Sequence, residues 1–166
     1  MYLTECLNSS HNKETFSCGK EILDNYLIKQ ATQDVKRKLS ACFVIADNPI
    51  KGIKGYYTLS NSSISLDSIP NVIREKLPKS YVNIPLTLIG RLAVDKIYQG
   101  QGIGKIILVD ALKRCHELSK QIGSFAVIVD PLDKDAELFY LKFGFIKLPD
   151  SGKMFLTMKT IVQLFK

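Results

Sequence analysis

The sequence has few of the residues that build metal sites or disulfide frameworks. It contains four cysteines and two histidines among 166 residues. No two cysteines stand at C-x-x-C spacing, and neither His11 nor His116 lies close enough to a pair of thiols to complete a zinc pattern. Because Cys42 lies in an apolar run and Cys115 in a helical one, we expect reduced thiols in a reducing compartment and no bound metal.

Long hydrophobic runs are absent as well. No apolar stretch approaches the ~20 residues that a membrane helix needs. The N-terminus, from Met1 to Cys6, lacks the basic segment and apolar core of a secretory signal. We therefore expect a cytoplasmic protein that makes no membrane contact. The 46% hydrophobic and 23% charged residues are ordinary for one globular domain over residues 1–166.

Charge of one sign prevails, with a formal net charge of +7. Such an excess serves solubility, or it attracts a phosphate-bearing ligand or a nucleic acid, and charge alone does not separate these roles. Basic side chains are candidates for contacts with a phosphate backbone, and their alternative role is a solvated helix face. They are Lys29, Lys36, Arg37, Lys38, Arg74, Lys76 and Lys79.

Hydrophobic periodicity predicts strands that alternate with helices. Strands are expected over 2–7, 41–46, 53–60, 84–94, 124–129, 145–148 and 153–158, and helices over 20–38, 70–77, 102–122 and 133–143. A turn at 47–49 makes the second and third strands an antiparallel hairpin. The order β-α-β-β-α-β-α-β-α-β-β predicts an α+β fold, in which helices cover a mixed sheet.

The segment Gln99-Gly100-Gln101-Gly102-Ile103-Gly104 joins the most apolar strand to the longest helix. Each glycine there costs about 0.5–1 kcal/mol relative to alanine, so a function must offset this cost. Backbone N–H groups directed at an anion from a helix N-terminus would do so, and Lys105 adds a positive charge. The patterns of the P-loop and of dinucleotide-binding sites both fail here, and a tight strand-to-helix turn is the structural alternative.

The order Q-x-x-G-x-G, from Gln99 to Gly104, resembles the pyrophosphate loop of the Gcn5-related N-acetyltransferases (GNAT family). The run Leu88–Asp95 is similar to the coenzyme-binding strand of that family, and Ala136–Phe145 to its A-x-x-F-Y-x-x-x-G-F block. Within the family, the chain is most similar to the toxin acetyltransferases of bacterial toxin–antitoxin pairs. That likeness rests on Phe16-Ser17-Cys18-Gly19, Leu23-Asp24-Tyr26-Leu27, Gly55–Ser60 and Ile84-Pro85.

This resemblance implies the acyl-CoA N-acyltransferase fold, a mostly antiparallel mixed sheet of six to seven strands that is splayed between strands 4 and 5. It also implies acetyl-CoA as co-substrate. The backbone of Ala93 and Val94 would hold the pantetheine arm, and Asp133 and Phe139 would lie near it. The pyrophosphate would be bound by Gln99, Gly100, Gln101, Gly102, Ile103, Gly104 and Lys105.

The resemblance also places Tyr140 at the position of the general acid. A phenol titrates near ~10 and a free thiol near ~8.5, so a tyrosine can protonate a leaving thiolate at neutral pH. The alternative is a core role, because Ala136, Phe139, Tyr140 and Phe143 share one helix face. Arg91, the only charged residue of its strand, is a candidate for contact with the acceptor or with RNA, or else a surface residue.

The strand before the loop offers no carboxylate to act as base. A lysine amine, with a pKa near ~10.4, needs such help far more than an α-amine near ~7.7–8.0. Together with the basic surface, which includes Lys36, Arg37 and Lys38, this favours the α-amine of aminoacyl-tRNA as acceptor. The protein would then be a toxin that blocks translation. Expected partners are aminoacyl-tRNA, a ribbon-helix-helix antitoxin and a second copy in a homodimer.

Two other classes of function remain open on the sequence. One is a GNAT enzyme that acetylates a small-molecule or protein amine and is not toxic. A polycationic acceptor would require an acidic pocket, and acids cluster only at Asp133, Asp135 and Glu137. The other is a coenzyme-binding module without catalysis, in which replacing Tyr140 would change no activity.

Overall fold

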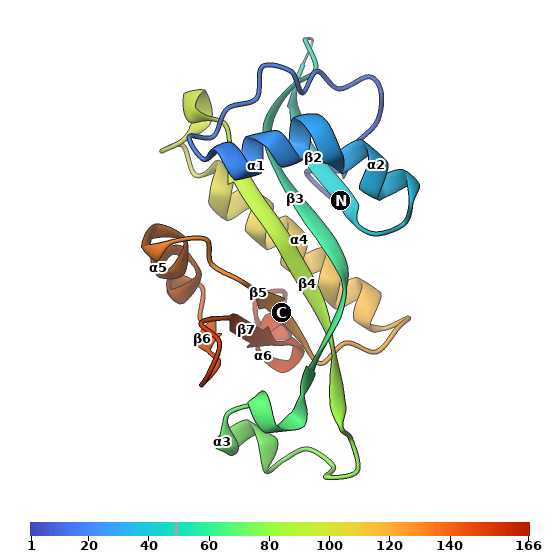
Figure 1. The fold of residues 1–166 in the computed structure, drawn as a ribbon, viewed down its shortest axis with the longest axis vertical. Coiled ribbons are helices and arrows are strands. Elements are labelled where there is room, and N and C mark those ends of the chain that lie inside the picture. Colours follow the sequence, from blue (N-terminus) through green and yellow to red (C-terminus); the bar gives the residue numbers. More distant parts are fainter. Residues whose placement is uncertain (49) are drawn as a thin grey trace. The chain divides into compact units, whose positions relative to one another are not determined.

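The computed structural model describes residues 1–48 and 50–166 (Figure 1). They form two compact units. The first comprises residues 1–60 and 89–112, and the second comprises residues 61–88 and 113–166. A single domain over residues 1–166 stays a prediction. The predicted turn at 47–49 includes Pro49, which lies outside the described residues.

A seven-stranded mixed sheet, in the hydrogen-bonded order β1-β2-β3-β4-β5-β7-β6, is the centre of the fold. Neighbouring strands are antiparallel in β1/β2, β2/β3, β5/β7 and β6/β7, whereas β4 and β5 are parallel. The prediction of an α+β fold with six to seven strands in a mixed sheet is therefore confirmed. The strands are β1 (Glu5–Cys6), β2 (Ala41–Asp47), β3 (Gly52–Ser65), β4 (Asn83–Val94), β5 (Ala126–Val129), β6 (Ile146–Lys147) and β7 (Met154–Thr157).

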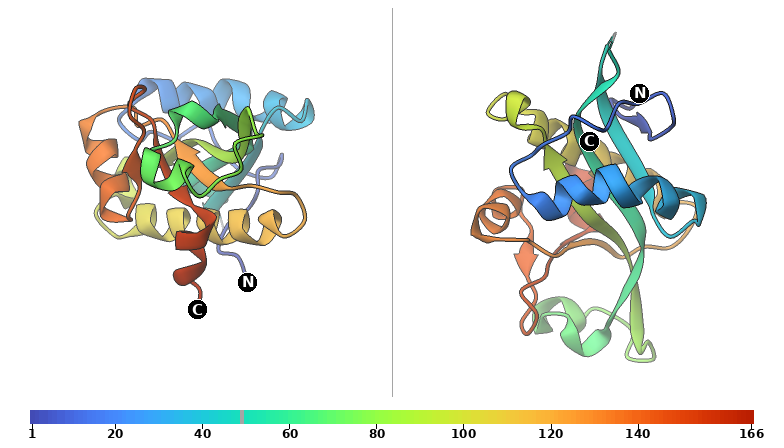
Figure 2. Two further views of the ribbon diagram at one scale, coloured as in Figure 1. Left: turned by 90° about the horizontal axis from the view of Figure 1, so that it is seen from below. Right: turned by 45° about the horizontal axis from the view of Figure 1, so that its top comes forward.

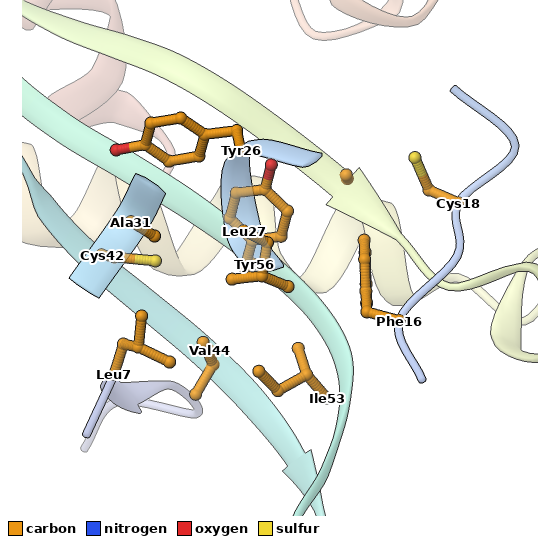
Figure 3. Packing of buried hydrophobic residues seen from close by; sticks show 11 residues of the cluster. Leu7, Phe16, Cys18, Tyr26, Leu27, Ala31, Cys42, Val44, Ile53 and Tyr56 are labelled. Atoms are coloured by element: carbon orange, nitrogen blue, oxygen red, sulfur yellow. The ribbon is translucent and has the colours of Figure 1, made fainter. Parts of the chain in front are cut away.

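In the first unit, helices cover both faces of the sheet (Figures 1 and 2). One face carries a continuous helical segment made of α1 (Glu21–Asn25), a π-helical turn (Tyr26–Gln30) and α2 (Ala31–Lys36). The other carries the first half of α4 (Ile103–Ser119), which follows a short 3-10 helix at Lys96–Tyr98. The core under the first helical segment includes the buried residues Leu27, Ala31, Cys42, Val44 and Tyr56 (Figure 3).

In the second unit, apolar side chains of β4 and β5 form a separate core with those of the following loops. Its buried members are Ile69, Ile84, Leu86, Ala126, Ile128, Leu148 and Phe155. The helices of this unit are α3 (Asn71–Arg74), α5 (Lys134–Lys142) and α6 (Met158–Gln163), and a 3-10 turn spans Leu66–Ser68. The backbone N–H of Phe125 donates to Pro85 O at 2.8 Å, which fixes how β5 starts beside the first half of β4.

Most predicted elements occur within a few residues of their expected bounds, with three differences. The predicted strand over 2–7 is a strand only at Glu5–Cys6, because Leu3 and Thr4 turn away to bind Asp110 of α4. The hairpin strand expected over 53–60 continues to Ser65. Helix α6 has no counterpart among the predicted elements, although Thr157 caps it by accepting a hydrogen bond from Thr160 N–H.

None of the helices in the described part of the chain combines the length and the hydropathy that crossing a bilayer requires.

Candidate functional site

The glycine-rich loop lies in the first unit and is braced by the segment at residues 16–19. Asp95, which is buried at the end of β4, accepts hydrogen bonds from the backbone N–H groups of Ser17 at 3.0 Å and Ile97 at 2.9 Å. In return, Lys96 N–H donates to Ser17 O at 2.8 Å. The start of the loop is therefore fixed by a segment about 80 residues earlier. The sequence alone indicates no role for Ser17 beyond the resemblance of its block.

Gln99 is the second brace of the loop. Its side-chain Nε2 donates to Cys18 O and to Val94 O, both at 2.8 Å. A glutamine amide has two N–H donors, so both are used inside the protein. The remaining side-chain oxygen is an acceptor and repels phosphate oxygens. Gln99 therefore shapes the loop, and its expected contact with a pyrophosphate is restricted to its backbone.

Gly100 and Gly102 adopt left-handed backbone conformations, with φ of 79° and 80°. A Cβ atom added at either position would meet no atom within 4 Å. Space is therefore not the constraint. Glycine is required here because a side chain disfavours positive φ by about 1–2 kcal/mol. The two left-handed residues turn the chain from β4 into α4 without side chains that would cover the backbone N–H groups.

The start of α4 presents donors that the helix itself does not use. Its first backbone bond runs from Ile106 N–H to Gly102 O at 3.1 Å. The N–H groups of Ile103, Gly104 and Lys105 therefore have no acceptor within the helix, as is true of the first N–H groups of any helix. α4 is 17 residues long, so its dipole adds positive potential at this end, and the side chain of Lys105 is exposed. This arrangement suits an anion with several oxygens, such as a pyrophosphate.

Before the loop, Ala93 and Val94 end β4. Ala93 is buried, and its carbonyl oxygen would lie 3.0 Å from a Cβ atom at Gly55 of β3, so Gly55 allows the two strands to approach closely here. β5 has four residues and β4 has twelve, so β5 cannot accompany β4 along its whole length. Part of β4 is thus without a β5 partner, and a ligand amide can use such a backbone edge.

The second unit holds Tyr140, the residue expected as general acid. Its side chain is 7% exposed, and its ring centroid lies 5.3 Å from that of Phe139 and 5.2 Å from that of Phe145. Burial raises the pKa of the Tyr140 hydroxyl above its ordinary value. Among the described residues, none forms a hydrogen bond with this hydroxyl. Tyr140 is therefore a core residue by packing, and its hydroxyl stays protonated and is not used by the fold.

Asp133 and Phe139, the other two candidates of the second unit, have clear local roles. Asp133 caps α5 by accepting a hydrogen bond from Ala136 N–H at 2.9 Å. Phe139 is half-buried, and its ring lies 5.1 Å from that of Phe143. The cap explains why a residue with a side-chain acceptor stands at position 133. The expected contacts of both residues with the pantetheine arm stay predictions.

Arg91 and the basic end of α2 belong to the first unit. The guanidinium carbon of Arg91 lies 3.5 Å from the centroid of the Tyr26 ring. Lys36, Arg37 and Lys38 are exposed where α2 ends, and Lys38 has a left-handed φ of 60°. In the described ranges 1–48 and 50–166, no three His, Cys, Asp or Glu side chains gather closely enough to hold a metal ion.

Comparisons with known proteins agree with this geometry. The family model "Acetyltransferase (GNAT) domain" matches residues 82–156, which contain β4, the loop, α4 and α5. A "tRNA-acetylating toxin" of Mycobacterium tuberculosis is 33% identical over 154 residues, which are 92% of this chain and 90% of the relative. A "Probable toxin TacT" of Sinorhizobium fredii is 29% identical over 93% of this chain and 89% of its own length.

Solved structures of bacterial toxins are similar over almost the whole chain. A tyrosine-to-phenylalanine variant of KacT has a TM-score of 0.92 at 30% identity, with 98% of both chains covered. AtaT in complex with acetyl-methionyl-tRNAfMet has a TM-score of 0.91 at 30% identity, again with 98% of both chains covered. A tyrosine-to-phenylalanine variant of AtaT, bound to acetyl-CoA and the C-terminus of the antitoxin AtaR, has a TM-score of 0.82 at 27% identity, covering 98% of this chain and 97% of the other.

Proposed function

Since the chain belongs to the GNAT family of acetyltransferases and to its tRNA-acetylating toxins, we propose that it transfers the acetyl group of acetyl-CoA to the α-amine of the amino acid on charged tRNA. An N-acetylated amino acid has no free amine for peptide bond formation, so this reaction blocks translation. The observation that carries the proposal is the braced loop at Gln99–Lys105, whose free N–H groups and lysine suit the pyrophosphate of the coenzyme.

The proposed binding of acetyl-CoA divides among three groups of residues. The backbone of Gly100, Gln101, Gly102, Ile103, Gly104 and Lys105 binds the pyrophosphate, and Gln99 holds that backbone in place. Ala93 and Val94 bind the amide groups of the pantetheine arm as a neighbouring strand would. The carbonyl of Val94 already accepts the Gln99 amide, so its N–H is the group left for the arm. Asp133 and Phe139 complete the environment of the arm.

The proposed chemistry is a direct transfer. The amine nitrogen attacks the thioester carbonyl carbon, the C–S bond breaks, and the Tyr140 hydroxyl gives its proton to the thiolate that leaves. Burial raises the Tyr140 pKa, so the hydroxyl holds its proton at neutral pH. None of the described residues forms a hydrogen bond with this hydroxyl, which supports a role in the reaction and not in stabilising the fold. The proton that the amine loses passes to water, and water returns a proton to Tyr140 before the next turnover.

The proposed acceptor is inferred from the absence of a carboxylate in β4. From Asn83 to Val94 the strand has no aspartate or glutamate to act as base. An α-amine with a pKa near ~8 is already neutral in roughly a tenth of molecules at pH 7, whereas a lysine amine near ~10.4 is almost wholly protonated. The exposed Lys36, Arg37 and Lys38, with Arg91, supply positive charge for the RNA backbone.

The partners of the proposed toxin follow from its function. A ribbon-helix-helix antitoxin binds it and stops the reaction, the chain acts as one N-acetyltransferase domain over residues 1–166, and two copies form a homodimer. The proposed place of action is the cytoplasm, because charged tRNA is the acceptor. The complex of AtaT with the C-terminus of AtaR supports a protein antitoxin.

The test is direct acetylation of charged tRNA. The purified protein is incubated with labelled acetyl-CoA and a mixture of aminoacyl-tRNAs, and the RNA is digested to nucleosides. We expect labelled N-acetyl-aminoacyl adenosine, and none with a Tyr140→Phe variant. Labelled protein or polyamine without labelled adenosine ester would overturn the proposal in favour of a GNAT enzyme with another acceptor. Binding of acetyl-CoA without transfer to any amine would leave only a coenzyme-binding module.

A further inference from the structure

Arg91 is a half-buried cation that has no anionic partner in the described part of the chain. Its charge instead faces the ring of Tyr26, with 3.5 Å between the guanidinium carbon and the ring centroid. A cation–π contact contributes about 0.5–2 kcal/mol, which only partly offsets the hydration that a half-buried charge loses. The guanidinium carries five N–H donors in one plane. A charge in this state is typical of a residue that binds an anionic ligand.

The Tyr26 ring that holds Arg91 is itself fixed from two sides. Its hydroxyl donates to the Asp34 carboxylate at 2.9 Å, and its ring is stacked on that of Tyr56, with centroids 6.4 Å apart. The Tyr56 hydroxyl in turn donates to Leu23 O at 2.7 Å. Figure 3 shows Tyr26 and Tyr56 side by side between the helical segment and the strands. The ring is therefore a rigid support for the guanidinium.

The electrostatics keep Arg91 free for a ligand. Asp34 is the buried carboxylate that accepts a hydrogen bond from the Tyr26 hydroxyl, and it also accepts one from the Gln30 amide at 3.4 Å. Burial raises the pKa of Tyr26 to about 12, so it stays a neutral hydrogen-bond donor. Two other titratable neighbours are the buried thiol of Cys42, whose pKa burial raises to about 12, and the Tyr56 hydroxyl, whose pKa burial also raises. In the described part of the chain, none of these groups forms an ion pair with the arginine.

The backbone at Tyr26 departs from a regular α-helix. Residues Tyr26–Gln30 form a π-helical turn between α1 and α2. Such turns are rare, interrupt the regular helical ladder and are frequent at functional sites. Tyr26 is the first residue of this turn, and Asp34 follows in α2. The interruption therefore falls at the residue that supports Arg91.

The position of Arg91 on β4 relates it to the acceptor. On the proposed function, the pyrophosphate binds at the loop and the pantetheine arm at Ala93 and Val94, so the thioester end of the arm lies further back along β4. Arg91 stands two residues before Ala93, on the same face of the strand and about 7 Å away along it. The acceptor ester must reach this end of the arm. Its nearest anion is the phosphate of the terminal nucleotide, to which the ester is linked through one ribose.

We propose that Arg91 binds the phosphate of the 3′-terminal nucleotide of the acceptor tRNA, and that Tyr26 and Asp34 are positioning residues that hold it for this contact. Arg91 thereby makes the enzyme prefer an amine carried on RNA to the same amine without a nucleotide. A planar guanidinium suits this contact because it binds a phosphate through two parallel hydrogen bonds. This inference rests on the proposed function and adds the group that selects the acceptor.

The first test measures binding and needs no catalysis. Deacylated tRNA is titrated with the wild type and with Arg91→Gln across a salt series. One lost charged hydrogen-bond pair, worth about 1.5–3 kcal/mol, raises the Kd about 10- to 100-fold. One lost contact with a single-stranded phosphate lowers the slope of log K against log salt by about 0.7. Lys120→Gln, which removes the same charge at an exposed position of the second unit, is the matched control and keeps the wild-type Kd.

The second test separates positioning from folding. For Tyr26→Leu, Tyr26→Phe, Asp34→Asn and Arg91→Lys, kcat and KM are measured with aminoacyl-tRNA and with the methyl ester of the same amino acid. Loss of the ring in Tyr26→Leu removes a cation–π contact and raises the KM for aminoacyl-tRNA about 2- to 30-fold. The preference for aminoacyl-tRNA over the methyl ester falls by the same factor. Tyr26→Phe keeps the ring and recovers most of the preference, and Arg91→Lys recovers part of it.

The outcomes are distinct. An unchanged tRNA Kd in Arg91→Gln overturns the inference, and so does an equal loss on both acceptors, which would show a general structural role. Acetyl-CoA binding and the Tm of each variant identify any variant that fails to fold. If a Tyr26 or Asp34 variant fails to fold, the Arg91 variants test the inference. If the wild type acetylates no aminoacyl-tRNA but its tRNA binding depends on Arg91, the proposed function fails and the phosphate contact stands.

Discussion

The side-chain Nε2 of Gln99 donates a hydrogen bond to the carbonyl oxygen of Val94 at 2.8 Å. The same nitrogen binds Cys18 O at 2.8 Å. One residue thus ties the start of the glycine loop to the end of β4 and to the brace at residues 16–19. The proposed binding groups for the pyrophosphate and for the pantetheine arm are therefore held in a fixed relation by a side chain that has no donor left for the ligand.

Replacing Gln99 by alanine tests this role. The carbonyl groups of Cys18 and Val94 lose their donor, at a cost of about 0.5–1.5 kcal/mol for each hydrogen bond. We expect the Kd for acetyl-CoA, measured by calorimetry, to rise tenfold or more. Gln163→Ala, at an exposed position of α6, is the control and keeps the wild-type Kd. A Gln99→Ala variant with wild-type affinity would show that the loop keeps its shape without this brace.

The second prediction concerns Gly102, whose φ of 80° is required by the turn into α4. Alanine at this position costs about 1–2 kcal/mol in backbone conformation, and relief of that strain reorients the N–H groups that follow. We expect Gly102→Ala to weaken acetyl-CoA binding and to lower the Tm. Gly123 has equally open surroundings and no positive φ. Equal effects of Gly123→Ala and Gly102→Ala would contradict the conformational argument.

The third prediction concerns Tyr140. Removing a general acid costs about 10²- to 10⁴-fold in rate, so Tyr140→Phe should abolish growth arrest on expression and reduce kcat by this factor. The Tm should stay the same, because no hydrogen bond of this hydroxyl occurs among the described residues. Tyr57→Phe is the matched control. Its hydroxyl donates to the buried Asp110 carboxylate at 2.8 Å, so this variant should lose stability and keep its chemistry.

The pH dependence of the reaction carries a fourth prediction. An acid acts only while protonated, so the rate falls as the pH rises through its pKa. Burial raises the pKa of Tyr140 above the ordinary phenol value near ~10. We therefore expect no alkaline loss of kcat from this group below pH ~10, in stopped assays short enough to avoid ester hydrolysis. A loss of kcat near pH 8 that disappears in Tyr140→Phe would contradict the assignment.

Thiol reactivity gives a fifth prediction. Burial raises the pKa of Cys18 to about 11, of Cys42 to about 12 and of Cys115 to about 12, whereas Cys6 is exposed. Thiolates are the reactive form, so an aromatic disulfide reagent should label one thiol of the native protein at pH 8 and all four after denaturation. The pKa values of these three thiols are higher in the folded state than in the unfolded state, where a thiol titrates near ~8.5. The stability that they contribute is therefore full below pH ~8.5 and is lost as the pH rises through the folded-state pKa values. Rapid labelling of Cys6→Ser would contradict the burial of the other three.

Local sequence signals were sufficient for much of the fold. The alternation of strands and helices, the seven strands and the glycine loop follow from hydrophobic periodicity and from backbone preferences, which act over a few residues. The likeness to tRNA-acetylating toxins over most of the chain confirmed the family and the acetyl-CoA co-substrate. The early end of the first strand was not predictable, because Asp110, more than 100 residues away, draws Leu3 and Thr4 from the sheet.

The sequence by itself predicted an anion-binding loop at residues 99–105, because three glycines at a helix start are locally unfavourable unless a turn or a ligand requires them. It also placed an arginine alone on an apolar strand. Only the tertiary structure decided which groups Gln99 and Arg91 contact. The partners of Gln99 include Cys18, and the partner of Arg91 is Tyr26, both in segments that the chain brings to β4 from far away. Long-range contacts depend on the packing of the whole unit, so no local pattern of residues encodes them.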